Sequence, residues 1–206
     1  IGMEMVPKRY EGLALSSGFA LFVLPYLLLA TPAGYLADRF SKRDVMVGCK
    51  IAEIIIMLLG IGAILIGNIY TIFAVLFLMG VHSTLFSPSK YGAIPEVVRP
   101  ECISAANGVI GMTTIVAIVL GTVTGSLLYV HTKPAGQTDW WLSALVLTAV
   151  AVLGTLTSLL IHRTPIANPT RAFPISLAAD TYRDLQRLFA SRVLLWAALG
   201  TALFWS

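Results

Sequence analysis

Charged residues are scarce in this chain, and their scarcity limits the class of protein it can be. Only 12% of the 206 residues are Asp, Glu, Lys or Arg, whereas 57% are hydrophobic. Soluble globular domains carry about 25% charged residues. The composition therefore excludes an ordinary soluble domain and predicts an all-α polytopic membrane protein.

Cysteine and histidine are also few. The two cysteines, Cys49 and Cys102, are too few for a disulfide framework, and we expect both to be reduced packing residues near the cytoplasmic ends of helices. Among the three histidines, His82 is expected to be a hydrogen-bonded residue of the helix bundle rather than a proton relay. The sequence predicts no catalytic residue, no metal site and no cofactor.

Long apolar runs occupy most of the chain. A helix of about 20 apolar residues, rising 1.5 Å per residue, crosses a hydrocarbon core of roughly 30 Å. We expect an N-terminal transmembrane bundle over residues 1–162, a cytoplasmic linker with an amphipathic interfacial helix over 163–192, and the beginning of a further span over 193–206. The expected spans of the bundle are residues 13–36, 45–66, 69–86, 103–129 and 140–161.

The cations lie in the short links between these runs. The net charge of +4 thus indicates membrane orientation and gives no reason to expect a nucleic-acid partner. The positive-inside rule places the loop 34–44 and the later basic links in the cytoplasm, while the external loop carries only Lys133. The inner cations are Arg39, Lys42, Arg43, Lys90, Arg99, Arg163, Arg171, Arg183, Arg187 and Arg192.

The loop after the first span carries the run Gly34-Tyr-Leu-Ala-Asp-Arg-Phe-Ser-Lys-Arg43. This spacing resembles the loop signature of the major facilitator superfamily, with Ser41 at the position of its usual second glycine. The resemblance implies that Gly34 and Asp38 form a latch of a conformational gate, in which the acid braces the cytoplasmic face against the opposite half. Arg39, Lys42 and Arg43 can also serve only to fix the topology.

Further motifs resemble the lysophospholipid transporter family of this superfamily. They are Ser87-Pro-Ser-Lys-Tyr-Gly92, Ala106-Asn-Gly108, Gly121-x-x-x-Gly125 and Gly200-Thr-Ala-Leu-Phe-Trp205. The resemblance implies a major facilitator fold of twelve helices, of which this chain is a fragment with helices two to six, the central linker and the start of helix seven. It also implies alternating-access transport of a lysophospholipid such as lysophosphatidylethanolamine across the bacterial inner membrane. Some relatives are fused to an acyltransferase, but no histidine here has the H-x-x-x-x-D spacing of that enzyme.

Several polar residues are candidates for contact with a substrate headgroup. Lys50 and Glu53 lie three residues apart in the second span, where charge is costly unless it is paired or faces a cavity. A phosphate would suit Lys50 and a headgroup amine would suit Glu53, although Lys50 can also reach the interface with Glu53 neutralising it. Lys90, Tyr91 and Asn107 are candidates at the inner mouth, with interfacial orientation and helix packing as the alternatives.

Gly121 and Gly125 predict a close helix contact rather than a substrate site. Two other functions stay open at this stage. The chain can belong to a major facilitator transporter of a small metabolite or drug, or form the membrane portion of a fused phospholipid acyltransferase. Proton-coupled drug export is the weaker choice, because the third span lacks arginine and the fourth lacks a Gly-Pro pair. In each case membrane lipids are the surrounding partners.

Overall fold

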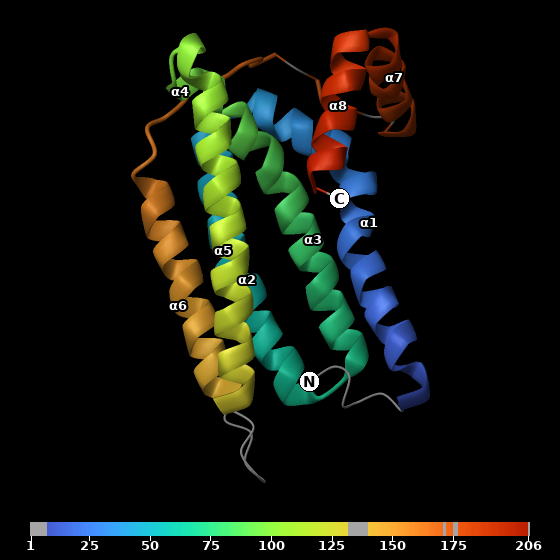
Figure 1. Ribbon diagram of the computed structural model, residues 1–206, viewed down its shortest axis with the longest axis vertical. Coiled ribbons are helices and arrows are strands. Elements are labelled where there is room, and N and C mark those ends of the chain that lie inside the picture. The colour runs from blue at the N-terminus through green and yellow to red at the C-terminus, as the bar shows by residue number, and fades with distance from the viewer. Residues whose placement is uncertain (1–7, 132–139, 171, 175–176, 206) are drawn as a thin grey trace.

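The computed structural model describes residues 8–131, 140–170, 172–174 and 177–205, and every regular element within these ranges is a helix (Figure 1). Two short 3-10 turns, η2 (Lys8–Tyr10) and η3 (Pro100–Cys102), accompany the α-helices. The α-helices are α1 (Glu11–Arg39), α2 (Lys42–Ile66), α3 (Ile69–Gly92), α4 (Ile94–Val97), α5 (Ile103–His131), α6 (Trp140–Leu159), α7 (Leu177–Ala190) and α8 (Arg192–Trp205).

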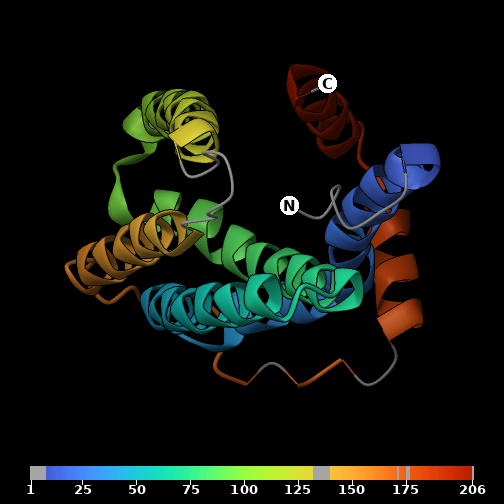
Figure 2. The ribbon, with the colours of Figure 1, turned by 90° about the horizontal axis from the view of Figure 1, so that it is seen from below.

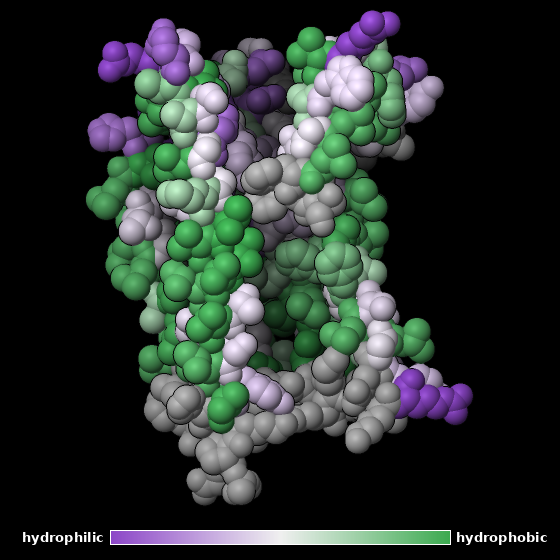
Figure 3. Space-filling model, in the orientation of Figure 1, coloured by the Kyte–Doolittle hydropathy of each residue, from purple (hydrophilic) through white to green (hydrophobic). Residues whose placement is uncertain are grey.

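Four segments of the described chain are long and apolar enough to cross a membrane. They are Gly12–Arg39, Lys42–Ile66, Ile69–Val97 and Pro100–Val130, and shorter apolar stretches occur at Leu145–Leu159 and Arg192–Thr201. Apolar side chains cover the middle of the molecule, while hydrophilic ones gather at the end that carries α4 and α7 and at the start of α1 (Figure 3). This distribution is that of a helix bundle with its apolar belt in lipid.

Helix α3 extends beyond the span expected at 69–86. It continues through Pro88 to Gly92. An internal proline removes only one backbone hydrogen bond, and the helix persists because the neighbouring turns keep their own hydrogen bonds. The hydroxyl of Thr84 donates to the carbonyl of Gly80 at 2.8 Å, and that of Ser87 donates to Ser83 at 2.8 Å. Lys90 and Tyr91 therefore lie on the last turn of a helix.

The turn between α2 and α3 has a local cause in two residues. Gly67 has φ of 68°, a left-handed conformation that closes α2 and favours glycine. The side chain of Asn68 then accepts a hydrogen bond from the backbone N–H of Tyr70 at 2.9 Å and caps α3. The two helices consequently run antiparallel.

The tightest helix contact joins α1 and α3. A Cβ added at Gly80 would lie 2.3 Å from the carbonyl oxygen of Phe22 and 3.0 Å from Cγ of Pro25. Pro25 is fully buried there, and α1 is continuous through both Pro25 and Pro32. Absence of a side chain at Gly80 thus lets the backbones of α1 and α3 meet.

The other helices differ in how closely they join this pair. α2 packs on α3 on one side and on α6 on the other. α5 stands apart and is exposed along most of its length, as the view from below shows (Figure 2). α7 returns to α1, where the Thr181 and Thr31 hydroxyl oxygens lie 2.9 Å apart.

Candidate functional site

The inner polar cluster consists of Lys50 and Glu53 from α2 and His82 from α3. Lys50 Nζ lies 2.7 Å from Glu53 Oε2, and the same carboxylate oxygen lies 3.7 Å from His82 Nε2. The side chains are 24%, 18% and 8% exposed, in the order Lys50, Glu53, His82. The structure therefore joins the two predicted charges on one helix and adds an imidazole from the next.

Helix α6 and an aromatic ring of α3 enclose the cluster. Lys50 Nζ lies 5.3 Å from the ring centroid of Phe86, within the range of a cation–π contact, and this ring stacks on His82 at 6.1 Å. On the α6 side, a Cβ added at Gly154 would lie 3.5 Å from Lys50 Nζ. The hydroxyl of Thr155 donates to the backbone carbonyl of Lys50 at 3.1 Å. Helix α6 thus forms the wall behind the lysine.

His82 differs from its expected role as a hydrogen-bonded residue. Neither ring nitrogen has a hydrogen-bond partner among the described residues, although the side chain is more than nine-tenths buried. The carboxylate of Glu53 is bonded to Lys50, and its distance of 3.7 Å from His82 Nε2 exceeds hydrogen-bond length. Sequence reasoning missed the approach of Glu53 to His82, because the two lie on different helices and only the packing of α2 on α3 relates them.

A second group of candidates lies at the end of α3. Lys90 Nζ lies 3.3 Å from the hydroxyl oxygen of Thr114 on α5 and 5.2 Å from the ring centroid of Tyr91. Tyr91 and Asn107 line a cavity of about 1080 Å³ between α5 and α8, together with Met112 and Thr201. This cavity offers a phenol, an amide and a hydroxyl beside a lysine.

One face of α3 relates the two groups. His82, Phe86 and Lys90 follow one another at intervals of four residues and so lie along a single stripe of the helix. Lys50 reaches this stripe from α2 through its contact with Phe86. The arrangement provides two cations, one carboxylate and one imidazole along a single path, which is chemistry suited to an anionic or zwitterionic group.

The first turn of α2 makes an ion pair with α4. Lys42 pairs with Glu96 and is only 5% exposed. A Cβ added at Gly92 would lie 3.0 Å from Cε of Lys42, so the lysine stem runs along the end of α3. Lys42, expected at the surface, is therefore buried in an ion pair that joins α2 to α4.

The first turn of α2 and the last turn of α1 are bound to the end of α6 and the segment that follows it. Arg43 donates from Nε to the carbonyl of Ile161 at 3.0 Å and from Nη2 to that of Leu159 at 3.1 Å. The Lys42 N–H donates to the Thr164 hydroxyl at 3.1 Å, and the Asn168 N–H donates to the Asp38 carbonyl at 2.9 Å. A cation on the last carbonyls of a helix is favoured by the helix dipole, so Arg43 closes α6. Gly34, Asp38 and Arg39 lie half-buried in the last turns of α1.

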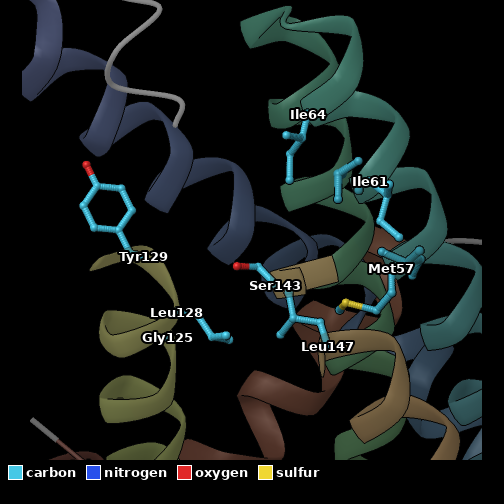
Figure 4. A pocket seen from close by; sticks show the side chains of 11 residues that line it. Met57, Ile61, Ile64, Gly125, Leu128, Tyr129, Ser143 and Leu147 are labelled. Carbon is cyan, nitrogen blue, oxygen red and sulfur yellow. The ribbon is translucent and has the colours of Figure 1, made fainter. Parts of the chain in front are cut away.

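The predicted packing glycines of α5 have no close neighbour in the described structure. A Cβ added at Gly121 or Gly125 would meet no described atom within 4 Å. Gly125 instead lines an apolar cavity of about 350 Å³ between α2, α3, α5 and α6, where Ile61, Leu128 and Leu147 converge (Figure 4). The packing role of Gly121 and Gly125 stays a prediction, while the close contact observed is that of Gly80.

Metal chemistry has no evident place in the part of the chain that the structure describes. Within it, no group of three or more His, Cys, Asp or Glu residues is placed to hold a metal ion. The inner polar cluster has one carboxylate and one imidazole, with a lysine ammonium bonded to the carboxylate.

Comparison with known proteins identifies the family. The family model described as Major Facilitator Superfamily matches residues 10–206. The chain belongs to the major facilitator superfamily. It is therefore a membrane protein, and its all-helical structure with long apolar helices agrees with that family.

Curated relatives within the superfamily share one description. The chain is 33% identical over 197 residues to the lysophospholipid transporter LplT of Serratia proteamaculans, covering 89% of this chain and 43% of that protein. It is 32% identical over 192 residues to LplT of Pectobacterium carotovorum, covering 89% of this chain and 42% of that protein. LplT of Salmonella paratyphi B is 32% identical over 197 residues, with 90% and 43% covered. The chain thus spans less than half the length of these relatives.

Proposed function

We propose that the complete protein moves a lysophospholipid, such as lysophosphatidylethanolamine, across the bacterial inner membrane by alternating access. The observation that carries the proposal is the similarity to LplT transporters across about nine-tenths of this chain. The polar stripe of α3 supports it, because an amphiphile needs a few headgroup contacts within an otherwise apolar bundle.

The headgroup site that we propose comprises Lys50, Glu53, Lys90, Tyr91 and Asn107. Lys90 is the first cation that a phosphodiester meets, since it lies beside the cavity lined by Tyr91 and Asn107. Lys50 is bonded to Glu53, so a phosphate there competes with a carboxylate for the ammonium. Glu53 is correspondingly the acceptor for a headgroup amine.

The loop of residues 34–44 is proposed to lie in the cytoplasm and to act as part of the conformational gate. Its cations favour that side under the positive-inside rule. The bonds of Lys42 to Glu96 and of Arg43 to the end of α6 support a gate that moves together with α4 and the linker. Gly34, Asp38 and Arg39 would present the α1 side of this gate to the other half of the transporter.

The partner that we propose is an acyltransferase, fused to the protein or separate from it. A lysophospholipid lacks one acyl chain, so a reaction that restores the chain must consume the delivered product. Membrane lipids are the proposed surroundings of the apolar side chains that cover the middle of the molecule (Figure 3). The activity of this chain itself is transport rather than acyl transfer.

Uptake of labelled lysophosphatidylethanolamine into spheroplasts tests the proposal. The complete parent protein should give uptake above an empty vector, and Asp38→Ala and Lys90→Ala should each reduce it at equal expression. Arg99→Ala is the matched control, because Arg99 is an exposed cation of the nearby link. Absence of uptake above vector, despite confirmed membrane expression, would contradict the lipid assignment and favour a small metabolite or drug.

A further inference from the structure

One face of α1 is joined to the linker by three contacts. The α1 residues that make them follow one another at intervals of four and three positions, so they share a helix face. The contacts are those of Thr31 with Thr181, Tyr35 with Phe173, and the Asp38 carbonyl with the Asn168 N–H. The linker partners come in the reverse order along the chain, so the linker runs antiparallel to the end of α1. We call these three contacts the clasp.

The groups that meet in the clasp are neutral. The hydroxyl oxygens of Thr31 and Thr181 lie 2.9 Å apart, and the backbone hydrogen bond to the Asp38 carbonyl is also 2.9 Å long. The rings of Tyr35 and Phe173 meet edge to face, with centroids 5.3 Å apart and planes at 80°. A neutral hydrogen bond adds little net stability, because water offers the same groups comparable bonds. Contacts of this kind are readily released and remade.

The beginning of the linker is held by stronger bonds. The guanidinium of Arg43 donates to the carbonyls of Leu159 and Ile161, and hydrogen bonds from charged groups are about twice as strong as neutral ones. The hydroxyl oxygen of Thr164, a residue that is 7% exposed, lies 3.4 Å from that of Ser41. The linker thus has a firmly held beginning and a weakly held continuation along α1.

The far end of the clasp leads directly into α8. Only Ser191 separates α8 from α7, the helix that carries Thr181. The Ser191 N–H donates to the Arg187 carbonyl at 3.2 Å, and the Leu195 N–H donates to the Ser191 carbonyl at 2.9 Å. Backbone hydrogen bonds therefore continue across the link, and α8 also packs on α7. A displacement of α8 consequently pulls on the contact between α7 and α1.

We propose that the clasp is a releasable lock, closed in the described structure, which opens and closes as α8 moves relative to α1 during transport. In the proposed alternating access, α8 begins the second half of the transporter, and the two halves rock against each other. Helix α1 is fixed in the first half by its close contact with Gly80 of α3. The clasp is then the weakest connection between α1 and α8. This inference rests on the proposed function, because alternating access supplies the movement.

Reversible disulfides test the lock in the complete protein. In a background of Cys49→Ala and Cys102→Ser, Thr31→Cys with Thr181→Cys places two thiols across the clasp. Hydroxyl oxygens 2.9 Å apart mark side chains that are within reach of a disulfide. Uptake of labelled lysophosphatidylethanolamine into spheroplasts is compared after oxidation and after reduction of the same sample. Oxidation should lower uptake several-fold, and reduction should restore it.

The matched control is a disulfide at the firmly held beginning of the linker. Ser41→Cys with Thr164→Cys joins positions whose hydroxyl oxygens lie 3.4 Å apart, in the same background. Oxidation of this pair should leave uptake at the level of the reduced protein. Where the reduced proteins take up the lipid, an equal response of the two pairs or no response of the clasp pair would overturn the lock. Failure of the clasp disulfide to form would overturn it as well.

Distances between spin labels test the lock without a substrate. Phe40 at the end of α1, Tyr182 on α7 and Arg163 at the beginning of the linker have exposed side chains for labelling. In the purified complete protein, labels at Phe40 and Tyr182 should give two distances, and labels at Phe40 and Arg163 should give one. Two distances without lysophospholipid uptake would support the lock and overturn the lipid function. A single distance for both pairs would overturn the lock whether or not lysophospholipid is transported.

Discussion

Gly80 of α3 faces the carbonyl oxygen of Phe22 on α1 so closely that a methyl group in its place would lie 2.3 Å from that oxygen. Backbone cannot yield as a flexible side chain can, and the adjoining Pro25 is fully buried. We expect Gly80→Ala to separate α1 from α3 and to lower the stability of the complete protein by about 2 kcal/mol. Thermal unfolding in detergent measures the change.

Gly48→Ala is the control for this substitution. Gly48 lies in α2, and a Cβ there meets no described atom within 4 Å. Since alanine is the better helix former, this variant should be neutral or more stable by up to about 1 kcal/mol. Equal melting temperatures for the two alanine variants would show that α1 and α3 are not in the contact described.

Removing one partner of the Lys42–Glu96 pair should be more harmful than removing both. Glu96→Gln leaves the ammonium of a residue that is 5% exposed without its counter-charge. The expected loss is about 3 kcal/mol, and the double variant Lys42→Met with Glu96→Leu should recover most of it. A double-mutant cycle of thermal stability provides the measurement, and additive losses would contradict a coupled pair.

Arg43→Ala should loosen the end of α6. The guanidinium donates to the carbonyls of Leu159 and Ile161, and hydrogen bonds from charged groups are worth about 1.5–3 kcal/mol each when well formed. Hydrogen exchange should therefore rise at residues 155–161. Arg163→Ala is the matched control, because the Arg163 side chain is 75% exposed and lies 3.6 Å from Asp44, away from the carbonyls that Arg43 binds. The same exchange in both variants would argue against the cap.

The two cysteines provide a test of membrane orientation. Cys102 is exposed, at the same end of the bundle as α4, and Cys49 is buried in α2. A thiol reagent that cannot cross membranes should label the parent protein in inside-out vesicles, and the Cys102→Ser variant should lose that part of the label. Labelling of Cys102 in intact spheroplasts would place the loop 34–44 outside the cytoplasm and reverse the proposed topology.

The all-helical membrane fold was predictable from this sequence, whereas few of the contacts between side chains were. The apolar runs and the motifs identified an all-α membrane bundle of the major facilitator type, because helix length and loop spacing are local properties. The approach of Lys50 to Glu53 was also foreseeable, since residues three apart share a helix face.

Contacts between helices that are distant in the sequence could not be predicted from local patterns. Gly80 makes the closest helix contact although no local motif marks it. Gly121 and Gly125 form a recognised motif, but a Cβ at either would meet no described atom within 4 Å. Likewise, Glu53 and His82 approach one another through the packing of α2 on α3. The C-terminal end of helix α3 lies at Gly92, beyond the expected span 69–86. The polar residues around Pro88 resemble a loop in the sequence, although the hydroxyl of Ser87 donates to a carbonyl of the same helix.

The partners of Lys42 and Arg43, in the first turn of α2, are synthesised at different times. Lys42 and Arg43 leave the ribosome long before Glu96 and Ile161, the latter 118 residues after Arg43. At synthesis rates of about 5–20 residues per second, Arg43 waits roughly 6–24 s for its acceptors. Lys42 waits a shorter time, because Glu96 follows it by 54 residues. Until these acceptors are made, the proposed cytoplasmic orientation would be favoured by both cations. In the proposed topology the same two side chains would act first in insertion, before these distant partners exist, and afterwards in assembly, as bonds that join the finished helices.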